Sequence, residues 1–135
     1  MDKYRAGLQQ RPANFAPLTP ISFLERSARV YPDKTAIIDG ERRLSYREMF
    51  ARCRRIADAL RWAGVGSLDT VSVFAPNSVA MLEMHFAAPM AGAVLNAINF
   101  RLDAPTVAFI LEHAENKVFL FDSELAPVDR AALEQ

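Results

Sequence analysis

The sequence predicts an α/β fold, in the form of a partial layered αβα subdomain with mainly parallel strands. Short apolar runs rich in β-branched and aromatic residues alternate with longer stretches whose apolar residues recur every three or four positions. Proline, glycine and helix-capping residues stand at the boundaries between these segments. Such alternation is typical of parallel strands joined by right-handed helical crossovers.

Composition and charge narrow the class of protein. The chain of 135 residues is 51% hydrophobic and 24% charged, which suits one domain with a core. Lys+Arg 16 balance Asp+Glu 16, so no net charge favours nucleic acid as a partner. Cys53 is the single cysteine, which excludes an internal disulfide and fits a reducing compartment. Because no apolar run approaches the ~20 residues of a membrane span, and no leader pattern opens the chain, we expect a cytoplasmic protein.

The N-terminal part divides into an arm and the start of the ordered domain. Residues 1–19 show no sustained periodicity, so we expect an arm there and the α/β subdomain over residues 20–135. Thr19 and Pro20 predict a helix start, and Pro32 predicts its stop.

A hairpin and a capped helix follow. Residues 35–39 and 42–44 read as two short strands joined by a turn at 40–41. The run Ser-Tyr-Arg-Glu at 45–48 matches a capping box, and the helix that it opens should end at Gly64.

The next strand and helix form the most apolar part of the chain. Residues 70–75 predict a strand, and a helix begins at Asn77 or Ser78. This helix is apolar nearly all round, so we expect it to be covered on both sides. We expect Pro89 to kink or end it. Four side chains are expected to join sheet to helix: Val71, Val73, Leu82 and Phe86.

The C-terminal part repeats the pattern. Residues 93–96 predict a strand, Asp103 should cap a helix running to about His113, and 117–121 predict a strong strand. A further helix opens around Pro127 with no strand after it, so the sequence reads as an incomplete subdomain.

The strand-to-helix turn at 74–78 is the first place to look for a phosphate site. Such a site needs several converging backbone N–H groups, and therefore glycines that tolerate positive φ. The five glycines stand at positions 7, 40, 64, 66 and 92, outside this turn, and Pro76 has no N–H to donate. We interpret the turn as structural, with an Asn or Ser helix cap.

Metal and nucleophile patterns are also missing from the sequence. His85 and His113 are the only histidines and lie far apart, and Cys53 falls on an apolar helix face, as a buried thiol would. No G-x-S-x-G motif occurs. The sequence therefore predicts no catalytic, cofactor-binding or metal-binding residue within this chain.

Three further features have a functional and a structural interpretation. Glu83 and His85 interrupt the apolar helix and are expected to bond within the fold rather than to a ligand. The loop 97–102 follows a strand, where α/β sheets bind ligands, but one Asn and one Arg define no chemistry. A group of charged residues on one helix is expected to form a solvated face rather than an anion site: Arg47, Arg52, Arg54, Arg55, Asp58 and Arg61.

Several short motifs give the chain a family resemblance. They are Y-P-D-K-T-A at 31–36, S-Y-R-E at 45–48, A-P-N at 75–77, A-G-A-V at 91–94, N-x-R-L at 99–102 and L-E-H-A at 111–114. With them the chain resembles the N-terminal portion of the AMP-forming acyl-CoA synthetases, within the adenylate-forming ligases. The wording at 84–96 is most similar to short- and medium-chain acyl-CoA ligases of the butyrate and methylmercaptopropionate type.

The resemblance implies a two-step reaction that needs ATP, Mg²⁺ and coenzyme A. A carboxylate attacks the α-phosphorus of ATP, which releases pyrophosphate, and the coenzyme A thiol then displaces AMP from the acyl-adenylate. The family's phosphate loop, ribose-binding aspartate and catalytic lysine match no residue here, so we expect the chain alone to be inactive. Its expected partners are a small carboxylic acid and the missing remainder of the same chain; a homo-oligomer stays open.

Two other classes remain as alternatives. One is a self-contained small α/β binding module of flavodoxin or receiver type, although Asp69 and Asp122 form no adjacent acidic pair of the kind that holds Mg²⁺ in receivers. The other is a non-catalytic interaction domain that docks through an apolar surface.

Overall fold

The computed structural model describes residues 7, 9, 11–13 and 15–134. Its elements in chain order are α1 (Pro20–Val30), β1 (Thr35–Asp39), β2 (Arg42–Ser45), α2 (Tyr46–Trp62), β3 (Thr70–Phe74), α3 (Val79–Ala91), β4 (Val94–Ile98), α4 (Ala104–His113), β5 (Asn116–Phe121), the 3₁₀ turn η1 (Ser123–Leu125) and α5 (Ala126–Leu133). Each helix and strand expected from the sequence is therefore present, with ends shifted by one or two residues.

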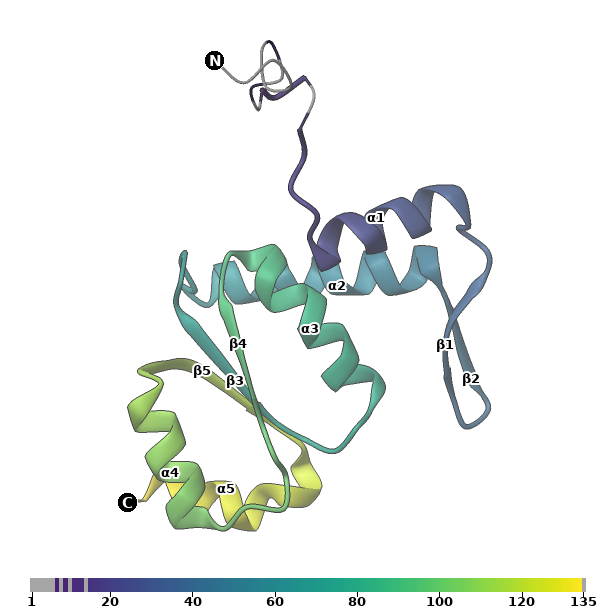
Figure 1. Cartoon of the computed structure of the whole chain (residues 1–135). Helices are drawn as coiled ribbons and strands as arrows, with labels where there is room; N and C mark the ends of the chain where they lie inside the picture. The colour runs from purple at the N-terminus through teal and green to yellow at the C-terminus, as the bar shows by residue number, and fades with distance from the viewer. Residues whose placement is uncertain (1–6, 8, 10, 14, 135) are drawn as a thin grey trace.

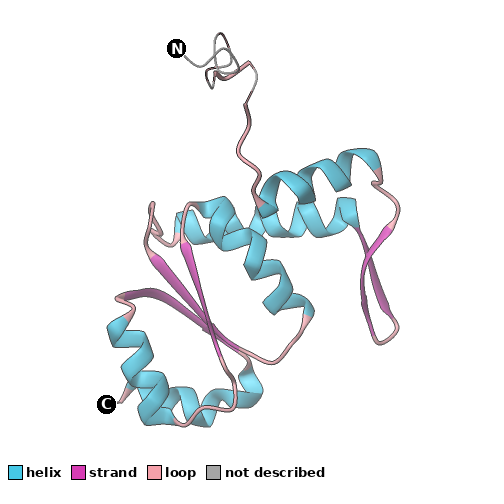
Figure 2. Ribbon diagram, in the orientation of Figure 1, coloured by secondary structure: helices cyan, strands magenta, loops and turns pink. Residues whose placement is uncertain are grey.

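A parallel sheet with helices on both faces forms the centre of the molecule (Figure 1). Its strand order is β4-β3-β5, and both pairings are parallel. Helices α2 and α3 pack together on one face, while α4 and α5 pack together on the other (Figure 2). The predicted α/β class with an αβα layering is confirmed.

The alternation of side chains along β3 explains the two layers. Val71 and Val73 point into the cluster formed with α2 and α3, whereas Phe74 belongs to the cluster of α4 and α5. All three are at most 4% exposed. A central strand buried on both faces is an apolar run rather than an alternating one, as the sequence of β3 is.

The hairpin β1–β2 is separate from this sheet. Its strands are antiparallel, and Asp39 pairs with Arg42 across the turn. Gly40 has φ +56°, which suits the tight turn predicted there. The hairpin packs against α2, as Ile37 and Leu44 join the same cluster as that helix.

Local capping explains where the helices begin. Thr19 and Ser45 each open a helix with a capping box, and the Ser45 box with Glu48 is the one that the sequence predicted. Asp103 caps α4 by accepting from the Thr106 N–H at 3.2 Å. Residues 7, 9, 11–13 and 15–19 of the predicted arm form no helix or strand, and the other residues of the arm lie outside the described part of the chain.

Helix α3 departs from two expectations. Leu82 was expected to join sheet to helix, but it is 41% exposed, and the buried positions include Met81, Met84 and Ala88 instead. The described residues therefore cover this helix on one side only. Pro89, which was expected to kink or end the helix, lies in its last turn; the helix continues to Ala91 and stops at Gly92, whose φ is +91°. A proline in the last turn is tolerated because few hydrogen bonds remain to be broken there.

Candidate functional site

The β3–α3 turn has the geometry of a helix cap. The Ser78 hydroxyl accepts from the Met81 N–H at 3.3 Å and so opens α3. None of the positive-φ residues among those described lies in this turn. Successive N–H groups therefore do not converge on a point where a phosphate would sit. Of the two predicted caps, Ser78 is the one used, and Asn77 is not.

The acidic residues near the sheet are separated by its length. Asp69 precedes β3 and accepts from the Gly66 N–H at 2.8 Å, whereas Asp122 follows β5 and accepts from the Glu124 N–H at 3.0 Å. Because β3 and β5 are parallel, Asp69 lies at the N-terminal ends of the strands and Asp122 lies at their C-terminal ends. Within the described residues no three His, Cys, Asp or Glu side chains gather in a way that suits a metal ion.

Glu83 and Arg52 form an ion pair that joins α3 to α2. Glu83 is 1% exposed. Arg52 Nε donates to one carboxylate oxygen, and its Nη2 donates to the other at 3.1 Å. This two-pronged geometry compensates the buried charge. The prediction that Glu83 bonds within the fold is confirmed, but the assignment of Arg52 to a solvated face was wrong.

Cys53 lies beside this pair and is fully buried. Its Sγ is 3.7 Å from the Glu83 carbonyl oxygen, to which it donates. Burial, with a smaller contribution from the Glu83 charge, raises the pKa of the Cys53 thiol to about 11. The prediction that Cys53 is a buried thiol is confirmed. A neutral thiol without access to solvent is not a nucleophile.

The other charged residues of α2 are mostly engaged locally. Arg47 pairs with Asp33 at 3.1 Å, and Arg61 pairs with Asp58 at 3.0 Å while also donating to the Met90 carbonyl oxygen. These contacts spread the positive charge over separate partners. They do not focus it on one anion site.

The loop after β4 is likewise internally bonded. It begins at Asn99, because β4 includes Ala97 and Ile98. Asn99 Oδ1 accepts from the Arg101 N–H at 3.1 Å, and the Arg101 guanidinium lies over the Phe100 ring at 5.4 Å. These two contacts are internal to the loop, and its expected structural role stays a prediction.

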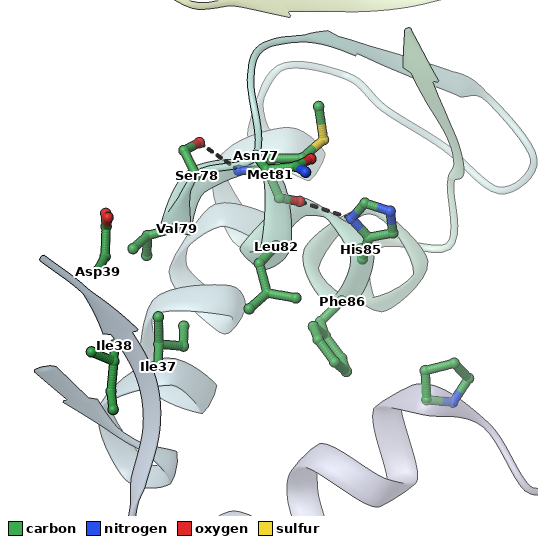
Figure 3. A pocket seen from close by; sticks show the side chains of 11 residues that line it. Ile37, Ile38, Asp39, Asn77, Ser78, Val79, Met81, Leu82, His85 and Phe86 are labelled. Carbon is green, nitrogen blue, oxygen red and sulfur yellow. Dashed lines mark hydrogen bonds between the residues drawn. The ribbon is translucent and has the colours of Figure 1, made fainter. Parts of the chain in front are cut away.

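An apolar cleft lies between the hairpin and α3. It has a volume of about 610 Å³. Ile37 and Ile38 of β1 lie on one side, and Val79, Leu82 and Phe86 of α3 lie on the other (Figure 3). Its remaining lining residues are Pro20, Asp39, Asn77, Ser78, Met81 and His85. We call it the α3 cleft.

Two polar side chains that line the α3 cleft, Ser78 and His85, bond within α3. The Ser78 hydroxyl caps the helix, and His85 Nδ1 donates to the Met81 carbonyl oxygen at 2.8 Å. The expectation that His85 bonds within the fold is confirmed. Because its lining is chiefly apolar, the cleft suits apolar packing better than acid–base chemistry. Sequence reasoning missed it, because nothing local shows that Ile38 and Leu82 face the same space.

The described residues form an α/β unit in which a parallel sheet lies between two pairs of helices. Residues 24–135 match the family model of the AMP-binding enzymes, and the chain belongs to that family. This agrees with the motifs that indicated an N-terminal portion of an adenylate-forming ligase.

Individual relatives agree on the reaction and differ in the acid. The chain is 50% identical to a peroxisomal butyrate–CoA ligase of Arabidopsis thaliana and 47% identical to a peroxisomal benzoate–CoA ligase of the same plant, in each case over 90% of this chain and 21% of the relative. A fatty acyl CoA synthetase of Mycobacterium tuberculosis has a similar structure, with a TM-score of 0.81 and 35% identity over 84% of this chain and 23% of that one. The chain thus spans about a fifth of the relatives it matches.

No helix among the described residues combines the length and the apolar character that crossing a bilayer requires.

Proposed function

We propose that this chain is the N-terminal part of an acid–thiol ligase that converts a short- or medium-chain carboxylic acid to its coenzyme A thioester. The acid is first activated with ATP to an acyl-adenylate, and the thiol of coenzyme A then displaces AMP. The observation that carries the proposal is the 50% sequence identity to a butyrate–CoA ligase over 90% of this chain.

In this proposal residues 20–135 are an incomplete α/β subdomain, and the catalytic residues lie in other parts of the whole enzyme. The β3–α3 turn does not fit a nucleotide phosphate, because it lacks converging N–H groups. Asp69 and Asp122 do not fit Mg²⁺, because they lie at opposite ends of the parallel strands. The chain's role is to hold the sheet and helices on which those parts rest. The 135 residues alone are expected not to turn over.

A chimera tests this division of labour. Residues 15–134 replace the matched segment of the Arabidopsis butyrate–CoA ligase, and AMP release from ATP is measured with butyrate and coenzyme A. We expect activity within about tenfold of the parent enzyme, and none above background from the 135-residue chain. AMP release by the isolated chain refutes the proposal, as does a chimera that folds but stays inactive.

The choice of acid requires a separate experiment. The chain is nearly as similar to the benzoate ligase as to the butyrate ligase, which suits a segment outside the acid-binding site. The complete enzyme that contains these residues is expected to prefer acetate, butyrate or octanoate over benzoate. The measurement is the ratio of kcat/KM values, and preference for the aromatic acid contradicts the proposed substrate class.

We further propose a cytoplasmic location. The single buried cysteine suits a reducing compartment, although the plant relatives named above are peroxisomal. A fluorescent fusion of the complete enzyme distinguishes diffuse cytoplasmic signal from a punctate organellar one.

A further inference from the structure

The tip of the hairpin β1–β2 presents an aspartate directly before a glycine. Asp39 is the last residue of β1, and Gly40 opens the turn that leads to Arg42 of β2. No other aspartate in the sequence precedes a glycine. Both residues are exposed, and Asp39 lies at the edge of the α3 cleft (Figure 3). The side chain of such a pair can react with the backbone that follows it, because glycine has no Cβ to shield its nitrogen.

The Asp39 carboxylate has no partner that holds it in place. Within the described residues it accepts no hydrogen bond and forms no ion pair. The other aspartate side chains that the structure describes are each engaged, by an arginine or by a backbone N–H: Asp33, Asp58, Asp69, Asp103 and Asp122. The carboxyl carbon of Asp39 is therefore free to turn toward the Gly40 nitrogen.

The turn around Gly40 leaves that nitrogen accessible. No backbone hydrogen bond in the described part of the chain uses the Gly40 N–H. Gly40 has φ +56°, and a Cβ added to it would meet no atom within 4 Å, so the space around it is open. The approach of the two groups therefore needs only local rotation of the backbone, which glycine permits more readily than other residues.

The tip is also the part of the hairpin that should open most easily. The hairpin is a two-stranded sheet separate from the central one, and Asp39 and Arg42 form its last register pair. Ile37 and Leu44 anchor the rest of the hairpin in the core beside α2. Because a two-stranded ribbon is only marginally stable where nothing packs on it, the exposed end pair should open locally while the base stays folded.

From these observations we propose that Asp39 is a site of spontaneous isoaspartate formation. The Gly40 nitrogen attacks Cγ of the Asp39 carboxyl group in its acid form. A C–N bond forms, the C–OH bond breaks, and the hydroxyl leaves with the amide proton as water. The product is a five-membered succinimide ring, which a further water molecule opens at either carbonyl carbon. Opening at the backbone carbonyl carbon of Asp39 leaves Gly40 attached through Cγ and frees the α-carboxylate.

The reaction changes the hairpin without any other reactant. Because the main chain of the product runs through Cβ and Cγ of the aspartate, it is longer by one atom at the turn. The register pair of Asp39 with Arg42 can then no longer form in its present geometry, and the edge of the α3 cleft changes with it. Since only water takes part, the proposal does not depend on the proposed ligase function.

Peptide mapping of the complete enzyme that contains these residues tests the proposal. The enzyme is stored for several weeks in neutral buffer, below its melting temperature, and is then digested with trypsin. Because trypsin cleaves after lysine and arginine, it releases residues 35–42, which contain Asp39, and residues 56–61, in which Asp58 is paired with Arg61. The isoaspartyl form of a peptide has an unchanged mass, elutes separately and accepts a methyl group from an isoaspartyl methyltransferase.

The two peptides should differ clearly. Isoaspartate should accumulate at Asp39 at least about fivefold faster than at Asp58, whose carboxylate is held and which precedes an alanine. The rate at Asp39 should also lie within about tenfold of the rate in a free synthetic peptide of residues 35–42, because the turn opens locally. Equal accumulation at the two aspartates overturns the proposal, and so does stronger protection by the fold.

Two substitutions at position 39 test the route. Asp39→Glu would have to form a six-membered ring, so the modified peptide should be lost, while the Tm should stay within ~2 °C because the position is exposed. Asp39→Asn should react through the same succinimide and release ammonia in place of water, which changes the mass of the peptide. Modification of residues 35–42 that persists in Asp39→Glu, or a peptide mass that stays constant in Asp39→Asn, overturns the proposal.

Discussion

Glu83 is a buried acidic residue that forms an ion pair with Arg52. Its carboxylate is buried between α2 and α3, and Arg52 supplies the compensating charge from 31 positions away in the sequence. Arg52 itself is partly exposed, with 34% of its side chain accessible. The pair therefore holds the two helices in one relative position, because sliding either helix separates the charges.

Removing the arginine should be costly. Arg52→Ala leaves an unpaired buried carboxylate and should lower the free energy of unfolding by about 3 kcal/mol, measured by urea denaturation. Glu83→Gln should cost less, since the amide is neutral. Arg55→Ala, at an exposed position of the same helix, serves as the control and should stay within ~0.5 kcal/mol. Equal losses in both arginine variants would contradict a specific role for the pair.

The buried Cys53 thiol should make the free energy of unfolding fall at alkaline pH. Because burial raises the pKa of its thiol to about 11 from the ordinary 9.0, the unfolded chain loses this proton at a lower pH than the folded one. The contribution is fully present below pH 9 and is lost as the pH rises toward 11. The loss reaches up to about 3 kcal/mol at most.

The matching measurement is the free energy of unfolding at pH 8 and pH 10.5, for the chain and for Cys53→Ala. Tyrosines and lysines titrate in both proteins, so their contribution cancels. Between these two pH values the free energy of unfolding should fall less in Cys53→Ala than in the unsubstituted chain. Parallel slopes would show that the thiol ionises as easily inside the fold as outside it.

The environment of a single residue could be predicted from the sequence only where the local pattern of apolar and polar residues determines it. The pattern indicated correctly that Cys53 is buried and that Glu83 bonds internally. It placed Arg52 with the solvated arginines because helical periodicity assigns each position to a face and carries no information about an acid on another helix. Only tertiary packing brings the two residues together.

At the scale of elements, the end of α3 depends on a glycine. Gly92 has φ +91°, and an added Cβ would meet only the Ser67 backbone at 3.8 Å, so space is available and conformation is the constraint. Gly92→Ala should therefore cost about 1 kcal/mol through backbone strain alone.

Gly66 is the natural comparison for this prediction. It is not at positive φ, and its added Cβ would meet Asp69 Oδ2 at 3.5 Å, an ordinary contact. Gly66→Ala should change the free energy of unfolding by less than about 0.5 kcal/mol or raise it slightly. Both values come from chemical denaturation, and a Gly66 variant as unstable as the Gly92 variant would contradict the argument.

The boundaries of helices and strands were predicted better than the contacts between them. Caps at Thr19, Ser45 and Asp103 and turn residues such as Gly40 are local signals, and each marks a boundary in the structure. The exposure of Leu82 was not predicted, because a helix that is apolar all round gives no sign of which side its neighbours occupy.

For the molecule as a whole, the α3 cleft is an apolar surface without a cover among the described residues. Ile38 is 65% exposed and Leu82 is 41% exposed at its rim. The isolated chain should therefore bind an apolar dye such as ANS and self-associate with rising concentration, whereas the chimera should do neither.

Replacing the rim residues tests this prediction. Ile38→Ser with Leu82→Ser should reduce dye fluorescence at least about twofold while lowering Tm by less than ~3 °C, because exposed side chains contribute little to folding. Leu133→Ser, exposed on α5 away from the cleft, is the control. An unchanged signal in the double variant would place dye binding elsewhere.

The arrangement of the whole molecule was the least predictable level. The sequence indicated parallel strands and flanking helices, yet the order β4-β3-β5 depends on which face each crossover takes. The α3 cleft arises between elements distant in the chain, so no local pattern marks it.

The position of β3 at the centre of its sheet has a consequence for synthesis. Val71 pairs with Leu95 and with Val118, both of which leave the ribosome later. At roughly 5–20 residues per second, this two-sided apolar strand waits for seconds before either neighbour can bond to it. The nascent chain therefore presents β3 to chaperones during that interval, whatever the stability of the finished protein.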